Sequence, residues 1–165
     1  MRRKDKEVTS REWMLEVLEE GAYAEVAMAD KTGRPYVLPM SYGYDDGHLY
    51  IHGALAGLKI DILKENPKVC FNVTVGVKMV TNEKDPSDVS AEFRSVTGFG
   101  TARFLSEPEE KLAAAELLME HYRAPMSERL VNKLRATSVI TIDIEEMTGK
   151  LSIRPKSSPV DPAKL

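Results

Sequence analysis

Hydrophobic and polar residues change their spacing several times along the chain, and each change predicts a new element. A first helix is predicted after the capping box Thr9–Glu12, and Gly21 is placed to end it in the left-handed conformation. A second helix is predicted over 58–65, before an Asn-Pro pair. A third is predicted over 106–122, where Ser106 and Glu109 fit another capping box. The pattern therefore predicts three helices.

Alternating apolar residues and turn residues between these helices predict strands. We predict seven, over residues 23–29, 35–44, 48–52, 68–75, 93–105, 138–144 and 150–153. Asp45–Gly47 is predicted to close a hairpin, Met147–Gly149 to lie near a turn, and 81–90 to form a loop. Seven strands in hairpin order predict a mainly β fold. We expect the antiparallel sheet to curl into a small barrel, because closure removes exposed edges.

Length and composition limit the organisation and the partners. A chain of 165 residues suits one domain, which we assign to 1–154, with 155–165 as a flexible or partner-contacting C-terminal tail. The formal charge of −3 gives no general attraction to nucleic acid or anionic lipid. The basic opening residues are not followed by an apolar stretch, so we expect no signal peptide and no membrane span. A single cysteine, Cys70, excludes an intramolecular disulfide, favours the cytoplasm and suits core packing better than catalysis.

Two histidines four residues apart are the first candidate for a site. His48 and His52 would share a metal ion on a helix. The residues between them favour a strand, however, where four residues span about 13 Å on one face. We therefore predict no metal site. His52 is the more informative of the two, because it adjoins a glycine-containing loop.

That loop, His52–Lys59, has the composition of a phosphate site. Phosphate favours backbone N–H groups that can approach closely, a helix N-terminus and a nearby cation, and all three are predicted within these eight residues. The spacing is not that of a P-loop. On this evidence, a plain strand-to-helix turn is equally consistent with the sequence.

Pro39 interrupts an otherwise well-formed strand. Because proline cannot donate to the ladder, this strand lies at an edge or contains a bulge, and its free backbone groups could face a flat heteroaromatic ring. Arg94 and Ser95 could add a cation and a hydroxyl. Gly98–Gly100 lacks the third glycine of the dinucleotide fingerprint and indicates a bulge or a tight bend.

Several of these segments, in this order, resemble the nitroimidazole-resistance branch of the pyridoxamine phosphate oxidase-like flavoproteins. The matching segments are Met1–Glu7, Pro35–Pro39, His52–Ala54 with Gly57, Lys59 and Asp61, and Arg94–Val96 with Gly98–Gly100. The resemblance implies a split β-barrel that forms a homodimer, with FMN at the subunit interface.

The resemblance also assigns site residues. It implies that the flavin ring lies along Leu38, Pro39, Met40 and Ser41, that the phosphate lies near His52, Gly53, Ala54 and Lys59, and that Arg94, Ser95 and Val96 complete the pocket. It further implies a catalytic role for His52, in orienting substrate or donating a proton. The chain lacks the Trp- and Arg-rich C-terminal segment of the oxidase proper, so vitamin B6 oxidation is not expected. It also lacks the C-terminal histidine of haem-handling relatives, since no histidine follows His121.

The resulting hypothesis is an FMN-dependent oxidoreductase that transfers electrons from a reduced nicotinamide to a small acceptor, such as a nitroaromatic compound. One alternative is a non-enzymatic module that binds a flavin, a deazaflavin or haem. Another is a dimer without a ligand.

Overall fold

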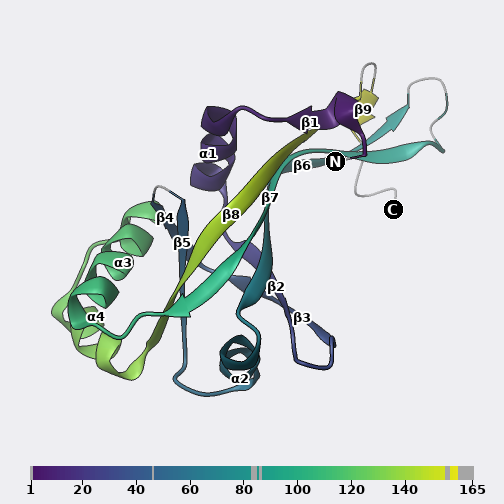
Figure 1. Ribbon diagram of the computed structural model, residues 1–165. Coiled ribbons are helices and arrows are strands. Elements are labelled where there is room, and N and C mark those ends of the chain that lie inside the picture. The colour runs from purple at the N-terminus through teal and green to yellow at the C-terminus, as the bar shows by residue number, and fades with distance from the viewer. Residues whose placement is uncertain (1, 46, 83–84, 86, 155–156, 160–165) are drawn as a thin grey trace. The chain divides into compact units, whose positions relative to one another are not determined.

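The computed structural model describes residues 2–45, 47–82, 85, 87–154 and 157–159. Two compact units share the chain. The first contains the described residues of Met1–Gly21, Val73–Val96 and Thr148–Leu165, and the second contains those of Ala22–Asn72 and Thr97–Met147. In chain order the elements are η1 (Lys4–Lys6), β1 (Glu7–Val8), α1 (Arg11–Glu20), β2 (Ala24–Ala29), β3 (Pro35–Met40), β4 (Tyr42–Asp45), β5 (His48–Gly53), α2 (Leu58–Glu65), β6 (Lys68–Asn82), β7 (Val89–Phe104), α3 (Pro108–His121), α4 (Glu128–Lys133), η2 (Leu134–Ala136), β8 (Ser138–Ser152) and β9 (Ser157–Pro159) (Figure 1).

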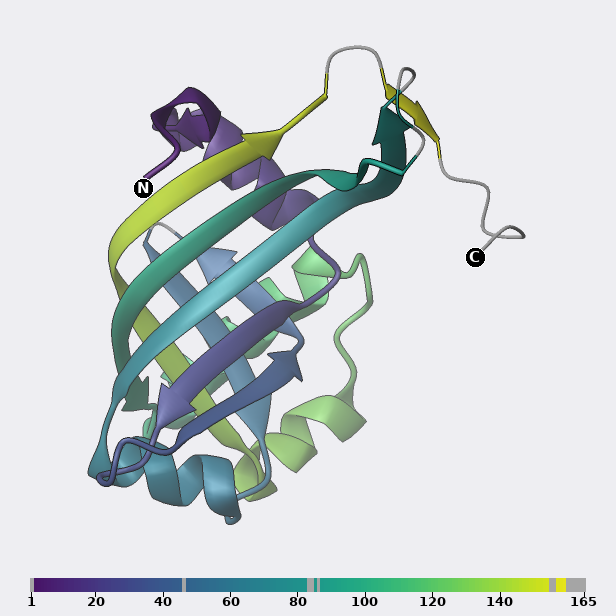
Figure 2. The ribbon, with the colours of Figure 1, turned by 90° about the vertical axis from the view of Figure 1, so that its right-hand side faces the viewer.

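The sheet of the second unit curls on itself. Its strands follow the order β3-β2-β6-β7-β8-β5-β4, so β3 and β4 stand at opposite ends. Yet only Ser41 separates them in the chain, and two Cα–Cα steps span at most about 7 Å. The two ends of the sheet must therefore come together, and Figure 2 shows the curvature that this requires. The predicted mainly β, antiparallel fold is confirmed.

The core of the second unit follows from strand alternation. Val69 and Phe71 of β6 are buried and Cys70 between them is only half-buried, because successive side chains point to opposite faces. The expectation that Cys70 is a core residue is thus wrong, although burial raises the pKa of its thiol, which does not favour a nucleophile.

Helix α3 covers β4 and β5 at close range, and α2 packs against β2. A Cβ atom on Gly43 of β4 would lie 2.7 Å from the backbone nitrogen of Leu118, so glycine is what permits this approach. At the end of α3, the Tyr122 hydroxyl donates to the Ala22 carbonyl oxygen (2.8 Å) and accepts from the Tyr42 amide (3.2 Å). These contacts fix α3 against the start of β4.

The first unit contains α1, β1 and one part of each of the three long strands β6, β7 and β8. β1 pairs with β8 and β9 pairs with β6. Trp13 of α1 packs on Gly149, where a Cβ atom would lie 2.8 Å from the indole ring. Within the tail, Ser157–Pro159 form β9, while 155–156 and 160–165 lie outside the described residues, so the role predicted for the tail stays a prediction.

Several helix predictions need correction. Ser10, not Thr9, caps α1 by accepting from the Trp13 amide, and Gly21 ends the helix in an extended conformation. Helix α3 starts at Pro108 with no side-chain cap, so the box at Ser106 does not form. Helix α4 was not predicted. It is short and all its residues except Leu130 are exposed, which leaves little apolar periodicity to detect.

Several strand predictions also need correction. Residues 35–44 form two strands, because the chain passes at Ser41 from one end of the sheet to the other. The two strands predicted over 138–144 and 150–153 form one strand, β8 (Ser138–Ser152), since Gly149 accommodates Trp13 and does not make a turn. β6 and β7 extend further into the predicted loop 81–90, to Asn82 and from Val89. Asp46, in the predicted turn at 45–47, lies outside the described residues, but β4 and β5 pair as expected.

No helix in the described part of the chain combines the length and the apolar character that a membrane span needs.

Candidate functional site

The strand-to-helix segment after β5 has an exposed loop and an uncapped helix start. Residues 54–57 connect Gly53 to α2 and are exposed. Gly57 takes φ 126°, which L side chains rarely adopt, and it occupies the N-cap of α2 without a side-chain hydrogen bond. Because no side chain caps α2, its first backbone N–H groups are available to an anion.

The Lys59 side chain turns back over the end of β5. Helical side chains tilt toward the N-terminus, and Lys59 is the second residue of α2. Its ammonium donates to the His52 carbonyl oxygen at 3.1 Å and lies 3.6 Å from the Met40 sulfur. A Cβ atom on Gly53 would lie 2.5 Å from Nζ, so glycine leaves the space that the ammonium occupies. Partial burial lowers the pKa of Lys59.

His52 lies in β5 opposite Val139, which confirms the predicted strand. Its side chain is exposed, and within the described residues its ring has no hydrogen-bond or ion-pair partner. Partial desolvation, then the Lys59 charge, lowers the pKa of His52. The imidazole is therefore mainly neutral near pH 7 and can both donate and accept a hydrogen bond. His48, at the other end of β5, lies 3.8 Å from an Asp143 carboxylate oxygen.

Strand β3 is an edge strand, as Pro39 predicted. It pairs with β2 through Leu38 opposite Val26 and Pro39 opposite Glu25, and it ends the strand order. Leu38 is half-buried, Pro39 exposed and Met40 buried, while Ser41 is half-buried at the junction with β4. One side of the β3 backbone is thus unpaired in the described sheet, beside the Met40 that contacts Lys59.

The structure brings together four residues predicted for the cofactor site: Met40, His52, Gly53 and Lys59. Leu38, Pro39, Ser41 and Ala54 adjoin them in the chain.

Arg94, Ser95 and Val96 belong to the first unit. There Arg94 forms an ion pair with Glu20, and the side chains of Ser95 and Val96 are buried. Their predicted part in a flavin pocket stays a prediction. Because the side chains of Ser95 and Val96 are buried, only the Arg94 side chain or backbone groups of this segment could contact a flavin.

The glycines at 98 and 100 lie within strand β7 and permit close packing. A Cβ atom on Gly98 would lie 2.4 Å from the Phe71 ring, and one on Gly100 would lie 2.4 Å from the Asp143 carbonyl oxygen. Close approach to neighbouring strands therefore explains both glycines.

The chain matches a known protein family over most of its length. The family model of pyridoxamine 5'-phosphate oxidase matches residues 10–151. The chain therefore belongs to the pyridoxamine 5'-phosphate oxidase family, as the sequence motifs indicated. A comparison with curated proteins gave no match.

Solved structures agree with the family assignment. A proposed 5-nitroimidazole antibiotic resistance protein from Bacteroides thetaiotaomicron is 28% identical, with a TM-score of 0.78 over 87% of this chain and 85% of that one. The FAD and haem binding protein from Mycobacterium smegmatis is 25% identical, with a TM-score of 0.75 over 96% and 78%. The flavocytochrome Anf3 from Azotobacter vinelandii is 22% identical, with a TM-score of 0.77 over 99% and 76%, and supports the fold alone.

Proposed function

We propose that this protein is an FMN-dependent oxidoreductase that transfers electrons from a reduced nicotinamide to a small organic acceptor. One observation carries the proposal. The Lys59 ammonium is held over Gly53, beside the uncapped start of α2 and the Met40 end of an edge strand. The solved structure at 28% identity, described as a nitroimidazole resistance protein, supports a nitroaromatic compound as one acceptor to test.

The residues present fit a flavin phosphate. A dianion needs a cation, backbone N–H donors and little side-chain bulk, and this segment offers Lys59, the first turn of α2 and Gly53 with Ala54. Partial burial of Lys59 strengthens the case, because an anion would compensate the desolvated ammonium. The unpaired side of β3 supplies backbone groups for the polar edge of a flat ring.

When bound, FMN would accept a hydride from a nicotinamide and pass electrons to an acceptor. The chain's own residues would bind and orient. Lys59 and the start of α2 would hold the phosphate, and residues Leu38–Ser41 would support the ring. His52, mainly neutral near pH 7, would position the acceptor through a hydrogen bond and could donate a proton from a ring nitrogen.

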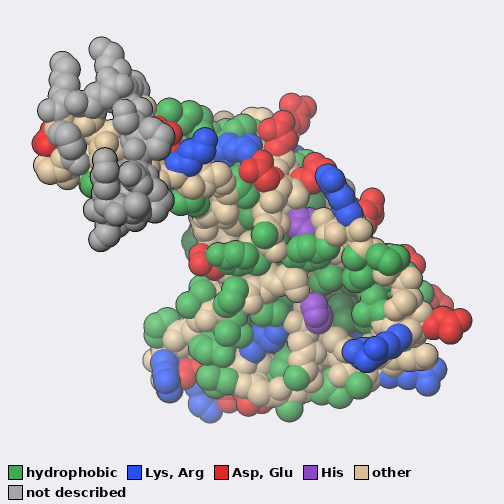
Figure 3. All heavy atoms as spheres, turned by 180° about the vertical axis from the view of Figure 1, so that it is seen from behind, with side chains coloured by type: hydrophobic (Ala, Val, Ile, Leu, Met, Phe, Trp, Pro, Cys, Tyr) green, Lys and Arg blue, Asp and Glu red, His purple; other side chains and the backbone are tan. Residues whose placement is uncertain are grey.

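The proposal includes a homodimer with the cofactor at the subunit interface. Its support is the number of large apolar side chains that are about half exposed in the second unit, among them Tyr23, Val37, Leu55, Leu58 and Phe99. Leu55 lies in the loop at the site, and Leu58 directly follows that loop. Figure 3 shows one face of the protein on which hydrophobic side chains gather around an exposed histidine. Sedimentation should give twice the chain mass of 18.4 kDa, and a monomer at micromolar concentration would exclude the interface site.

Cofactor binding tests the central observation. FMN fluorescence should be quenched by the wild-type protein, and Lys59→Ala should weaken binding by about 10- to 150-fold, the effect of losing a hydrogen bond to a charged group. Lys64→Ala is the matched control, because Lys64 is exposed in the last turn of the same helix. Equal affinity of Lys59→Ala and Lys64→Ala for FMN would overturn the assignment.

Turnover tests the enzymatic part. The reconstituted protein should be yellow, should bleach with NADH or NADPH without oxygen, and should regain its colour with an acceptor such as a nitroimidazole. His52→Ala should keep its colour and lose acceptor turnover. A yellow protein that no reduced nicotinamide bleaches would instead be a flavin-binding module.

A further inference from the structure

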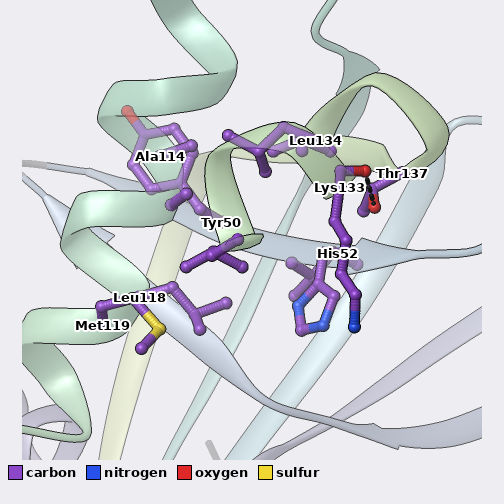
Figure 4. Close-up of a pocket in the computed structure, with 12 residues that line it drawn as sticks. Tyr50, His52, Ala114, Leu118, Met119, Lys133, Leu134 and Thr137 are labelled. Carbon is purple, nitrogen blue, oxygen red and sulfur yellow. Dashed lines mark hydrogen bonds between the residues drawn. The ribbon is translucent and has the colours of Figure 1, made fainter. Parts of the chain in front are cut away.

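A cavity of about 330 Å³ lies in the second unit between β5 and the helical segment that contains α3, α4 and η2. Tyr50, Ile51 and His52 of β5 form one wall, with Val139 of β8. The opposite wall consists of Ala114, Ala115, Leu118, Met119, Leu130 and Leu134 (Figure 4). The volume is at the lower end of the range of small-molecule pockets, about 300–1,000 Å³.

The polar side chains of this cavity are few, and its only ionisable nitrogen groups within the described lining belong to His52 and Lys133. Figure 4 shows the His52 ring and the Lys133 side chain next to each other, reaching in the same direction from opposite walls. Within the described residues, neither the Lys133 ammonium nor the His52 ring has a hydrogen-bond or ion-pair partner. The described lining contains no acidic side chain. The Lys59 ammonium, bonded to the His52 carbonyl oxygen, adds positive charge nearby.

The walls favour a ring over an open chain. The Tyr50 ring offers an aromatic contact, and the Met119 sulfur is polarisable and packs well on aromatic groups. A compact apolar ligand would displace water from aliphatic walls, and one negative charge would meet the two nitrogen groups at one end.

We propose that this cavity binds a small aromatic carboxylate, with the ring between β5 and α3 and the carboxylate between His52 and Lys133. The site extends beyond the flavin site proposed above, which it adjoins only at His52. It does not require bound flavin.

Calorimetric titration of flavin-free protein with 4-methylbenzoate tests the proposal. We expect a Kd of about 1 mM or tighter, in line with the efficiency of small ligands. The neutral isostere 4-methylbenzamide should bind at least about 10-fold more weakly, because it carries no negative charge to pair with the Lys133 ammonium. Hexanoate, which has the charge without the ring, should also bind more weakly. Equal binding of the acid and the amide would overturn the electrostatic part, and no binding of the acid would overturn the whole.

Three variants locate the probe. Lys133→Met, which keeps the apolar stem, should weaken 4-methylbenzoate binding about 5- to 10-fold and leave the amide unchanged. Arg129→Met is the matched control, since Arg129 is exposed on the same helix and does not line the cavity. Ala115→Leu should fill the cavity and abolish binding of both compounds, with folding checked by circular dichroism.

The flavin site at Lys59 and the cavity at Lys133 can be tested separately. If Lys59→Ala abolishes 4-methylbenzoate binding and Lys133→Met does not, the probe occupies the loop site, and the cavity proposal is wrong. If 4-methylbenzoate depends on Lys133 in a protein that binds no FMN, the cavity proposal stands alone.

Discussion

Replacing Gly53 with alanine should separate cofactor binding from folding stability. A Cβ atom at this position would lie 2.5 Å from the Nζ atom of Lys59 and 3.1 Å from its Cε atom. Gly53 is not among the glycines with positive φ, so the backbone tolerates alanine. The end of the lysine side chain must therefore move, and its 3.1 Å hydrogen bond to the His52 carbonyl oxygen must break.

The effect on the free energy of unfolding should be limited. Losing this hydrogen bond, whose donor is charged, costs about 1.5–3 kcal/mol, and alanine restricts the unfolded chain by about 0.4–1 kcal/mol in the stabilising direction. These contributions oppose each other, so the net loss of unfolding free energy should stay below about 2.6 kcal/mol. The proposed phosphate site, by contrast, depends on where the ammonium lies. FMN affinity should fall by about 10-fold or more, which is about 1.4 kcal/mol or more of binding free energy.

Thermal unfolding and FMN fluorescence titration, performed on the same samples, measure the two quantities. In a Lys59→Ala background, Gly53→Ala should have little further effect on FMN affinity, because both changes remove the same ammonium from the site. If Gly53→Ala binds FMN as tightly as the wild type, the position of the Lys59 ammonium does not matter for the cofactor. If the melting temperature instead falls by more than about 10 °C, the new Cβ atom has displaced the backbone and not only the end of the Lys59 side chain, and the reasoning is wrong.

Three further predictions concern the second unit. Gly98→Ala should destabilise the fold by about 1–3 kcal/mol in urea unfolding, because its Cβ atom would meet the packed Phe71 ring at 2.4 Å; an unchanged midpoint would contradict this. The pKa of His52 is lower in the folded protein than in the unfolded chain, so the unfolded chain takes up a proton at a higher pH. The free energy of unfolding should therefore fall as the pH drops below about 6.5, and His52 should have no effect on it well above that pH. In NMR titrations, Lys59→Met should raise the pKa of His52, and a fall would refute the assigned charge effect. Tyr122→Phe should cost about 1–3 kcal/mol, since its hydroxyl joins two backbone groups, and a change below about 0.5 kcal/mol would show that water replaces it.

The sequence predicted what depends on local rules. The span of α2 was predicted correctly, because Gly57 and Asn66-Pro67 mark its ends with backbone chemistry. Pro39 correctly predicted an edge strand, because a residue without a backbone N–H cannot donate to a neighbouring strand in any sheet.

The sequence could not predict what depends on distant neighbours. Gly149 resembled a turn residue, but it is explained by Trp13, far away in the chain. The contact between Lys59 and Met40 joins two segments that no local spacing relates. Lys133 was missed because α4 was missed. The signal available was Ser127, an N-cap residue type whose hydroxyl accepts from the Leu130 amide.

Pro39 also limits unwanted pairing at the edge formed by β3 in the described sheet. An unpaired strand edge can recruit the edge of another molecule, and successive additions give fibres. Pro39 removes one backbone donor near the end of β3, and an incoming strand would need an unbroken row of such donors. A Pro39→Val protein should accordingly remain folded and yet aggregate at a lower concentration. The absent backbone N–H of Pro39 both keeps a second strand from pairing with this edge and leaves the edge open to a ligand.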